Sequence, residues 1–268
     1  MIDMTASKIE GSSSVFAMDE NGKSVDIMLV EERALTIYID NKEIVTLMTM
    51  GSYPELLVLG YLKNQTFFES IEEVKVVQVD WQTNAVAVVS NKKNSNIEKL
   101  HEHRTVTSGC GQGTMFGNVL ESLTGQQLPS HSIKQSVLYY LLSYLGRHNQ
   151  VYKKAGGVHG CALCKGKDVL FFVEDVGRHN AVDTIAGHMW LNRIKGDDCI
   201  FYTTGRLTSE MVIKVAQMGV PILLSRSGAT KMGYELARQF GVTLISRAKG
   251  RHFQILNGAE CIVFDEPP

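Results

Sequence analysis

The first part of the chain is patterned like a half-buried sheet. Apolar residues alternate with polar ones over residues 25–44, and Asp-Asn-Lys at 40–42 supplies turn residues. The same alternation of apolar and polar residues recurs at residues 74–80 and 85–89. A period of two is typical of strands with one buried face, so this part is predicted to be antiparallel strands. Residues 54–64 carry apolar side chains at helical spacing and predict a helix.

Beyond residue 155 the pattern becomes an alternation of strands and helices. A hairpin is predicted first, because Lys-Gly-Lys-Asp separates two apolar runs. Short strands then alternate along the chain with helices of about ten residues. This alternation is typical of crossover units and a parallel sheet. The predicted elements are strands 158–164 and 169–173, helix 178–194, strand 199–202, helix 209–218, strand 220–224, helix 229–240 and strand 242–245.

Three regions follow from these patterns. Residues 14–100 form a smaller N-terminal subdomain, mainly of antiparallel strands, and end in a polar linker near residues 91–96. Residues 101–130 form a glycine-rich loop and linker. Residues 131–268 form the α/β domain, which opens with a core-packing helix at 132–149. The fold class is therefore predicted to be α/β.

Composition adds limits to this picture. The chain has 268 residues, 44% of them hydrophobic and 21% charged, and a net charge of −1. This balance builds a sizeable core and gives no global field that favours nucleic acid or a membrane. The first sixteen residues are polar, which argues against a signal peptide, and no run is apolar enough for a membrane span. Five cysteines at irregular spacing do not indicate a disulfide framework. We expect a cytoplasmic protein with reduced thiols.

An arginine follows each of three predicted parallel strands. Arg206, Arg226 and Arg247 each come after a hydroxyl residue near the strand end. Carboxyl ends of parallel strands share one edge of a sheet, and that edge lies beside the N-termini of the next helices. Helix N-termini and guanidinium groups both suit phosphate. Each arginine alone would be read as a solvated surface residue, but the three together predict a polyanion site.

A basic stretch extends this edge. It runs without interruption as Arg247, Ala248, Lys249, Gly250, Arg251 and His252. Glycine inside it would let the backbone approach a phosphate closely. On its own the stretch could be a basic turn without a ligand, but beside the three arginines it favours a ligand that carries a nucleotide.

Cys110 lies in the sequence Thr-Ser-Gly-Cys-Gly-Gln-Gly at residues 107–113. Glycine on both sides places the sulfur on an uncrowded backbone, a setting that a buried structural cysteine does not need. An accessible thiolate can act as a nucleophile or carry a transferable sulfur atom. The alternative is a flexible turn with an incidental cysteine.

Glu-Asp-Val-Gly-Arg-His-Asn at residues 174–180 closes a strand and opens a helix. Arg178, His179 and Asn180 suit base recognition or acid/base chemistry, and Asp175 suits a helix cap. Capping alone does not explain the whole string.

His159, Cys161 and Cys164 invite a metal interpretation. Side chains alternate along a strand, so His159 and Cys161 share a face while Cys164 points to the other. One ion cannot take all three without a bulge, and the deaminase motifs His-x-Glu and Pro-Cys-x-x-Cys are absent from the sequence. No metal held by protein side chains is expected.

Three motifs resemble one family. The string Glu-Asp-Val-Gly-Arg-His-Asn-Ala-Val-Asp (174–183), the upstream Gly-Gly-Val-His (156–159) and the downstream Thr-Gly-Arg-Leu-Thr-Ser-Glu-Met (204–211) are similar to those of the formate dehydrogenase accessory sulfurtransferases of the FdhD family. The resemblance runs from about residue 30 to residue 263 and is strongest after residue 156.

The resemblance implies a cytoplasmic sulfur carrier with a fold like that of the cytidine deaminases, without their zinc, and a homodimer. Such a protein takes persulfide sulfur from a cysteine desulfurase and passes it to the molybdenum bis(molybdopterin guanine dinucleotide) cofactor, before the cofactor enters formate dehydrogenase. By position the persulfide cysteine is Cys110, and the stretch from Arg247 to His252 binds the cofactor and its guanine nucleotide moiety. The family loop usually reads Cys-x-x-Cys, whereas Gly113 stands at the second position here.

Two other functions stay open on the residues alone. A cofactor-binding chaperone without catalytic activity needs the same polyanion edge and no reactive thiol, and Gly113 favours it. A metal-dependent nucleotide hydrolase would need bound zinc.

Overall fold

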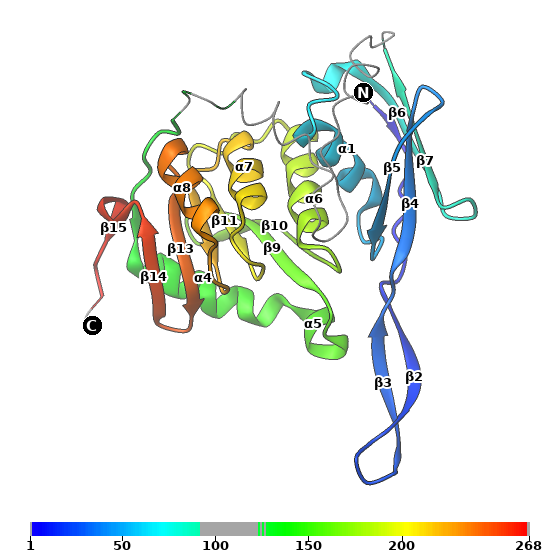
Figure 1. Ribbon diagram of the computed structural model, residues 1–268, viewed down its shortest axis with the longest axis horizontal. Coiled ribbons are helices and arrows are strands. Elements are labelled where there is room, and N and C mark those ends of the chain that lie inside the picture. Colours follow the sequence, from blue (N-terminus) through cyan, green and yellow to red (C-terminus); the bar gives the residue numbers. More distant parts are fainter. Residues whose placement is uncertain (1, 92–122, 124, 126, 267–268) are drawn as a thin grey trace.

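The computed structural model describes residues 2–91, 123, 125 and 127–266. Two sheets organise these residues, joined by two packed helices (Figure 1). Residues 92–122, which include Cys110 and most of the predicted linker, lie outside the described part of the chain. In the described ranges, no helix has the length and apolar character needed to cross a membrane.

The N-terminal sheet has five strands in the order β1-β6-β7-β4-β5. The alternation predicted from the sequence appears as a buried face lined by Leu35, Ile37 and Ile39. The turn at Asp40 and Asn41 is confirmed, since both residues have positive φ values of 47° and 68°. The elements of this part are β1 Asp3–Met4, β4 Arg33–Ile39, β5 Lys42–Thr49, α1 Pro54–Asn64, the 3₁₀ helix η1 Ile71–Glu73, β6 Val74–Asp80 and β7 Ala85–Ser90.

The prediction of antiparallel strands over residues 25–44 is confirmed, but it did not say which strands pair. Strand β3 (Ser24–Val30) does not join β4 and β5 in a sheet. It pairs along its whole length with β2 (Ser12–Met18), a strand in a region that looked only polar, and the two form a separate hairpin. The hairpin projects away from the rest of the molecule (Figure 1).

The C-terminal sheet has six strands in the order β10-β9-β11-β12-β13-β14. The predicted hairpin and the parallel pairs β11–β12 and β12–β13 are confirmed. Beyond them the chain forms β14, which the sequence did not predict. The elements are β8 Ile133–Lys134, α4 Gln135–His148, α5 Gln150–Ala155, β9 His159–Lys165, β10 Asp168–Asp175, α6 Arg178–Leu191, β11 Ile200–Thr203, α7 Ser209–Gln217, β12 Ile222–Ser225, α8 Lys231–Phe240, β13 Thr243–Lys249, β14 His252–Asn257, η2 Ala259–Cys261 and β15 Ile262–Val263.

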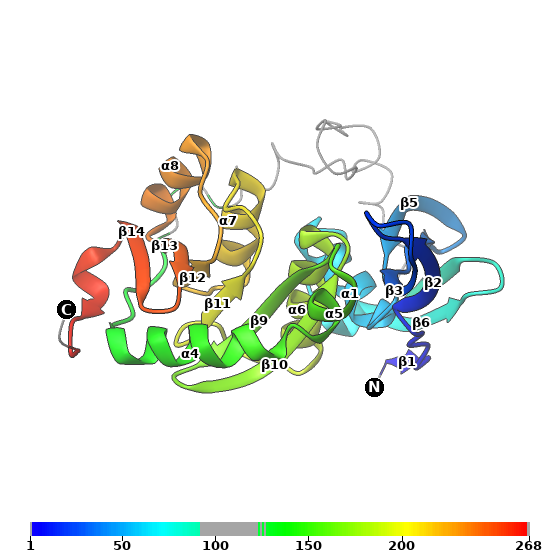
Figure 2. The same cartoon turned by 90° about the horizontal axis from the view of Figure 1, so that it is seen from below.

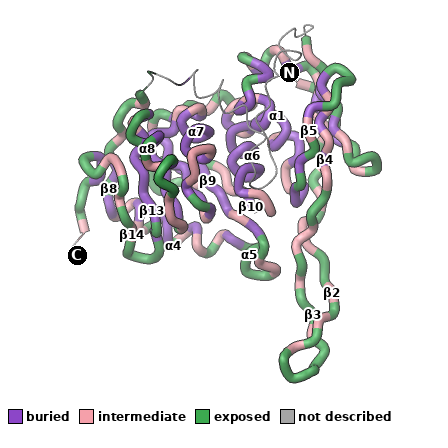
Figure 3. Tube along the Cα trace, in the orientation of Figure 1, coloured by how far each residue is buried: buried purple, intermediate pink, exposed green. Residues whose placement is uncertain are grey.

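Helices cover both faces of the C-terminal sheet. Helix α4 packs its apolar stripe, including Leu138 and Leu145, on one face. Helices α6, α7 and α8 cover the other face (Figure 2). Both faces of the central strands are buried, so these strands appear as continuous buried segments in Figure 3. This mixed α/β architecture, with a sheet flanked by helices, agrees with the predicted fold class.

Helices α1 and α6 join the two sheets by crossing at very short distance. A Cβ atom on Gly60 would lie 1.7 Å from the carbonyl oxygen of Asp183, and one on Gly187 would lie 1.9 Å from the carbonyl oxygen of Leu56. Only glycine fits at both positions. Beside the crossing, Lys214 Nζ contacts both carboxylate oxygens of Asp183 at 2.8 and 2.7 Å.

Candidate functional site

Strand direction brings four polar strand ends to one edge of the C-terminal sheet. Strand β9 is antiparallel to both β10 and β11, so β10 runs in the same direction as β11, β12 and β13. Asp175 and Thr203 therefore end their strands at the edge where Ser225 ends the next one. His159, which begins β9 and pairs with Asp175, lies at this same edge.

Four arginines gather there. Arg178 opens α6, Arg206 and Arg226 follow β11 and β12, and Arg247 lies near the end of β13. Backbone hydrogen bonds tie these segments to one another: the Arg226 N–H donates to the Thr203 carbonyl at 3.1 Å, and the Arg247 N–H donates to the Ser227 carbonyl at 2.9 Å. The parallel strand order predicted that Arg206, Arg226 and Arg247 would lie at one edge of the sheet, and the structure shows them there. We call these four residues the arginine edge.

Arg178 differs from the other three because its side chain is buried, with 8% exposure, while Arg206, Arg226 and Arg247 are exposed. It lies against the loop after β11, where a Cβ atom on Gly205 would come within 3.1 Å of its Cβ and Cδ atoms. Gly205 thus allows the Arg178 stem to pass under the loop.

The pKa values of two imidazoles at this edge are lowered, which favours their neutral forms. Burial and the positive charges of Arg178 and Arg206 lower the pKa of His159. Burial lowers the pKa of His179 to about 2, helped by Lys214 and Arg178. Its Nε2 atom lies 3.1 Å from Glu210 Oε2, on the first turn of α7. The positive charge that an anion would meet is therefore carried by guanidinium groups and not by these histidines.

Asp175 has a different role from the predicted helix cap. The N-cap position of α6 is Gly177, with no side-chain cap. Asp175 accepts hydrogen bonds from Thr49 Oγ1 at 2.6 Å, Asn180 Nδ2 at 2.9 Å, and the N–H groups of Gly177 and Met50 at 3.0 and 3.2 Å. Burial raises the pKa of this carboxyl group, and the four donors oppose that shift. Asp175 thus connects the two sheets.

Asn180 belongs to the same buried network. Its Nδ2 atom donates to the Met48 carbonyl at 2.6 Å as well as to Asp175, and the residue is 1% exposed. The structure places Asn180 beneath the arginine edge, in contact with the N-terminal sheet, and not on the surface of the edge. Glu174 also has a structural contact, since its carboxylate accepts the N–H groups of Val151 and Tyr152 at the start of α5.

The basic stretch forms a hairpin between β13 and β14. Arg247 has a φ of 49° and lies at a break in the strand register, and Gly250, with a φ of 61°, makes the turn. Lys249 and His252 are exposed, whereas Ala248 is buried in the core under α4. Arg251 turns toward the C-terminus: its guanidinium contacts Glu266 at 2.9 Å and lies 4.7 Å from the Tyr139 ring centroid.

Sequence reasoning missed Lys214. Its ammonium group is buried against Asp183, which also accepts a hydrogen bond from Asn64 Nδ2 at 2.7 Å. Burial raises the pKa of Asp183, and Lys214 opposes this. Lys214 also lowers the pKa of His179. The only sequence signal was a lysine four residues after Glu210, one helical turn along α7.

The cysteines within the described ranges are unsuited to sulfur chemistry. Cys161, Cys164, Cys199 and Cys261 are all buried. Burial raises the thiol pKa of Cys161 and Cys164 to about 12, and that of Cys199 to about 11. Cys161 and Cys164 belong to the cores on opposite faces of the sheet, as strand alternation predicts. Cys110, the predicted persulfide cysteine, lies outside the described residues.

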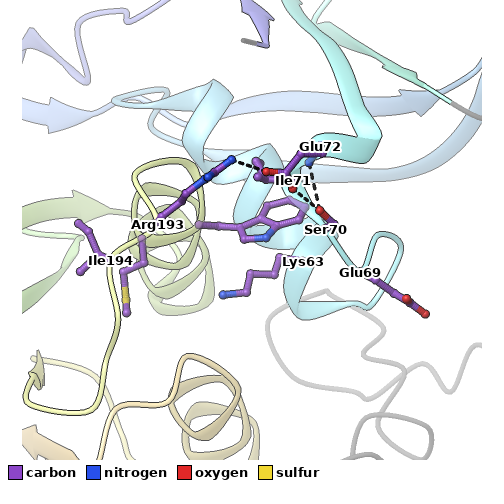
Figure 4. A pocket seen from close by; sticks show the side chains of 9 residues that line it. Lys63, Glu69, Ser70, Ile71, Glu72, Arg193 and Ile194 are labelled. Atoms are coloured by element: carbon purple, nitrogen blue, oxygen red, sulfur yellow. Dashed lines mark hydrogen bonds and ion pairs between the residues drawn. The ribbon is translucent and has the colours of Figure 1, made fainter.

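A hollow of about 350 Å³ lies at the other end of α6 (Figure 4). Lys63 and Trp190 line it, together with an ion pair between Arg193 and Glu72. Burial lowers the pKa of Lys63. None of the residues predicted from the sequence lines this hollow, so it is separate from the arginine edge.

Comparison with known proteins agrees with these features. The model of the FdhD/NarQ family matches residues 30–263. A sulfur carrier protein FdhD from Wolinella succinogenes is 30% identical over 250 residues, which cover 91% of this chain and 84% of the relative. The sulfur carrier protein FdhD of Bacillus subtilis is 28% identical, over 89% of this chain and 91% of the relative.

A solved structure supports the same relationship. A crystal structure of a Desulfotalea psychrophila protein, named a formate dehydrogenase accessory protein, superposes with a TM-score of 0.74. The two proteins are 25% identical, and the match covers 94% of this chain and 98% of the other. With the family model matched over most of its length, the chain belongs to the FdhD/NarQ family.

Proposed function

We propose that this protein is a sulfur carrier required for formate dehydrogenase activity. It accepts sulfur from a cysteine desulfurase on Cys110 and transfers it to the molybdenum bis(molybdopterin guanine dinucleotide) cofactor, before that client enters formate dehydrogenase. The observation that carries the proposal is the arginine edge, in a chain that belongs to this family.

The arginine edge suits the phosphates of such a client. Three of its guanidinium groups are exposed, and each can donate two parallel N–H bonds to a phosphate. Helices α6, α7 and α8 begin just after the strands that end there, so their N-termini add partial positive charge. Lys249 and His252 extend the surface, and His179 offers a neutral ring at its base. The guanine nucleotide moiety is proposed to bind here.

Cys110 is proposed as the sulfur-bearing residue. Its thiolate attacks the outer sulfur of a desulfurase persulfide. A new S–S bond to Cys110 forms while the donor's S–S bond breaks, and the donor leaves as a thiolate. The outer sulfur is transferred without net oxidation or reduction. A free thiol with a reference pKa of about 8.5 is only partly ionised at neutral pH, so cationic neighbours would favour the reactive form.

Labelled sulfur tests this step directly. Wild type and Cys110→Ala are incubated with a cysteine desulfurase and ³⁵S-cysteine, and protein-bound label is counted before and after thiol reduction. We expect reducible label on wild type and none on Cys110→Ala. Cys261→Ala is the matched control, because Cys261 is buried, and it should take up label like wild type. Equal labelling of wild type and Cys110→Ala would contradict the carrier role.

Gly113 favours a second candidate, a cofactor chaperone that binds the client without carrying sulfur. Without a second cysteine the loop cannot close a local disulfide. This candidate predicts that Cys110→Ala still restores formate dehydrogenase activity in a deletion strain. The sulfur carrier predicts that it does not.

A further inference from the structure

Tyr202 places a phenol oxygen in the core near the arginine edge. The residue lies on β11, is 0% exposed, and packs between the C-terminal sheet and α4. Its oxygen has no hydrogen-bond partner among the described residues. Burying a hydroxyl group without a partner costs free energy, and a phenylalanine would fill the same space without that cost. Packing alone therefore does not explain the hydroxyl group.

A second buried oxygen belongs to Asn149, which lies between α4 and α5. The residue is 2% exposed, and its Oδ1 atom also lacks a hydrogen-bond partner in the described part of the chain. Its Nδ2 atom donates to the Leu145 carbonyl at 3.2 Å, which orients the amide. A Cβ atom on Gly160 would lie 2.3 Å from Oδ1, so the glycine leaves room for this oxygen against the sheet.

The strand register brings both oxygens to the same face of the sheet. Tyr202 pairs with Ala162 on β9, and both belong to the core under α4. Gly160, which Asn149 covers, lies two residues from Ala162 and faces the same side. The Asn149 amide therefore lies on the α4 side of the sheet, next to the strand that carries Tyr202.

Arg226 approaches the same place from the other neighbouring strand. Tyr202 pairs with Leu224 on β12, and Arg226, two residues further on, points to the same face. The Arg226 N–H donates to the Thr203 carbonyl at 3.1 Å, so the strand geometry continues as far as this residue. Burial raises the pKa of Tyr202 to about 12, and both Arg226 and Asn149 oppose this shift, as expected of groups beside the phenol.

The three groups are chemically complementary. A guanidinium group has five N–H donors and no acceptor, whereas phenol and amide oxygens can both accept. Arg226 can therefore bind both oxygens with one side of its guanidinium group and turn another side to a phosphate. Its exposed position at the arginine edge leaves that second side accessible.

We infer that Tyr202 and Asn149 are positioning residues, which hold the guanidinium group of Arg226 in place for the phosphates of the ligand. A guanidinium group that is held before the ligand arrives loses less conformational freedom on binding. The inference rests on the proposed function, since it concerns the same anion site.

A double-mutant cycle tests this arrangement in the full chain, with guanosine diphosphate as the ligand in calorimetry. Tyr202→Phe keeps the ring and removes only the oxygen. It should lower the affinity by about threefold to tenfold, the factor that one hydrogen bond contributes, without lowering the urea midpoint. In an Arg226→Ala background the same substitution should have no effect, because the guanidinium group that it holds is gone. Tyr140→Phe, at an exposed tyrosine on α4, is the matched control and should bind like wild type.

A second substitution makes the test independent of a change in the sheet. Asn149→Ala removes the other oxygen and should lower the affinity by a similar factor, again only while Arg226 is present. Either variant binding like wild type would overturn the inference. So would an equal loss of affinity with and without Arg226, which would show a merely structural role. A wild type that does not bind guanosine diphosphate is a different result, because it would refute the proposed nucleotide site and the inference together.

Discussion

Helix α6 serves two regions that use charge in opposite ways. Its first turn contributes Arg178 to an edge where the other arginines are exposed to solvent. Its middle contributes Asp183 and Gly187 to the crossing with α1, where the charges of Asp183 and Lys214 are buried and paired. Perturbed pKa values occur in both regions, so a perturbed pKa alone does not mark the functional one.

Solvent exposure separates the two regions better than pKa does. The buried pair stabilises the junction of the two sheets, and removing one partner leaves an uncompensated charge. The exposed guanidinium groups add little to stability and are available to a ligand. Substitutions at the crossing should therefore change stability, and substitutions at the arginine edge should change binding.

The largest effect is expected at the helix crossing. In Gly187→Val the new side chain would begin 1.9 Å from the Leu56 carbonyl oxygen, so the helices must separate. We expect a loss of more than about 3 kcal/mol in the free energy of unfolding, measured by urea denaturation. Gly146→Val is the control, because a Cβ atom there meets nothing within 4 Å. Equal losses in both variants would refute the packing argument.

The next largest loss in the free energy of unfolding is expected for Lys214→Met. It leaves the Asp183 carboxylate buried without its cation, which costs about 3–5 kcal/mol near neutral pH. The folded-state pKa of Asp183 then lies further above its unfolded value, so the variant is most stable at low pH and loses stability as pH rises through the folded-state pKa. Urea denaturation from pH 5 to 8 measures this. Lys165→Met, at an exposed pair with Asp198, should show no resolvable loss. A pH-independent deficit in Lys214→Met would contradict the ionic explanation.

Arg206→Ala should reduce binding and leave stability unchanged. A charge-assisted hydrogen bond contributes about 1.5–3 kcal/mol, so the affinity for guanosine diphosphate should fall by about tenfold to a hundredfold in calorimetry. Arg193→Ala removes an exposed arginine at the opposite end of α6 and should bind like wild type. If both variants bind equally well, the arginine edge is not the anion site.

The smallest expected effect is that of pH on binding. Because the pKa of His179 is lowered to about 2, its ring does not change charge between pH 6 and 8. The pKa of His159 is also lowered, which moves its titration toward the acid end of this range. A GDP-sugar is a suitable probe, since its diester pyrophosphate does not titrate in this range. In a His252→Ala background, which removes the exposed imidazole of the basic stretch, its affinity should vary by no more than about twofold. A steep fall in affinity with rising pH would show that one of these imidazoles binds as a cation.

Local pattern predicted the C-terminal domain well. Strands buried on both faces and helices of ten residues give strong signals, and the parallel order alone placed Arg206, Arg226 and Arg247 at one edge. Which strand pairs with which was harder to predict. Residues 24–30 alternate as a strand should, yet alternation does not reveal the partner, which is β2.

Contacts between distant residues could not be predicted from the sequence. Asp175 lies just before a helix and looks like a cap, but its partners include Thr49, 126 residues away. The same applies to Lys214 and Asp183, which meet across two helices. The basic stretch at residues 247–252 was interpreted as an extension of the last strand that could form a turn, and Gly250 does make that turn. Strand β14, which follows the turn, was not predicted.

The central claim is that Cys110 carries the sulfur atom. Mass spectrometry of the peptide that contains Cys110, after incubation with cysteine and a desulfurase, tests it most directly. The account predicts a mass increase of one sulfur atom on this peptide, lost on treatment with a thiol reductant and absent without the desulfurase. An unmodified Cys110 peptide from a sample whose arginine edge binds guanosine diphosphate would contradict it.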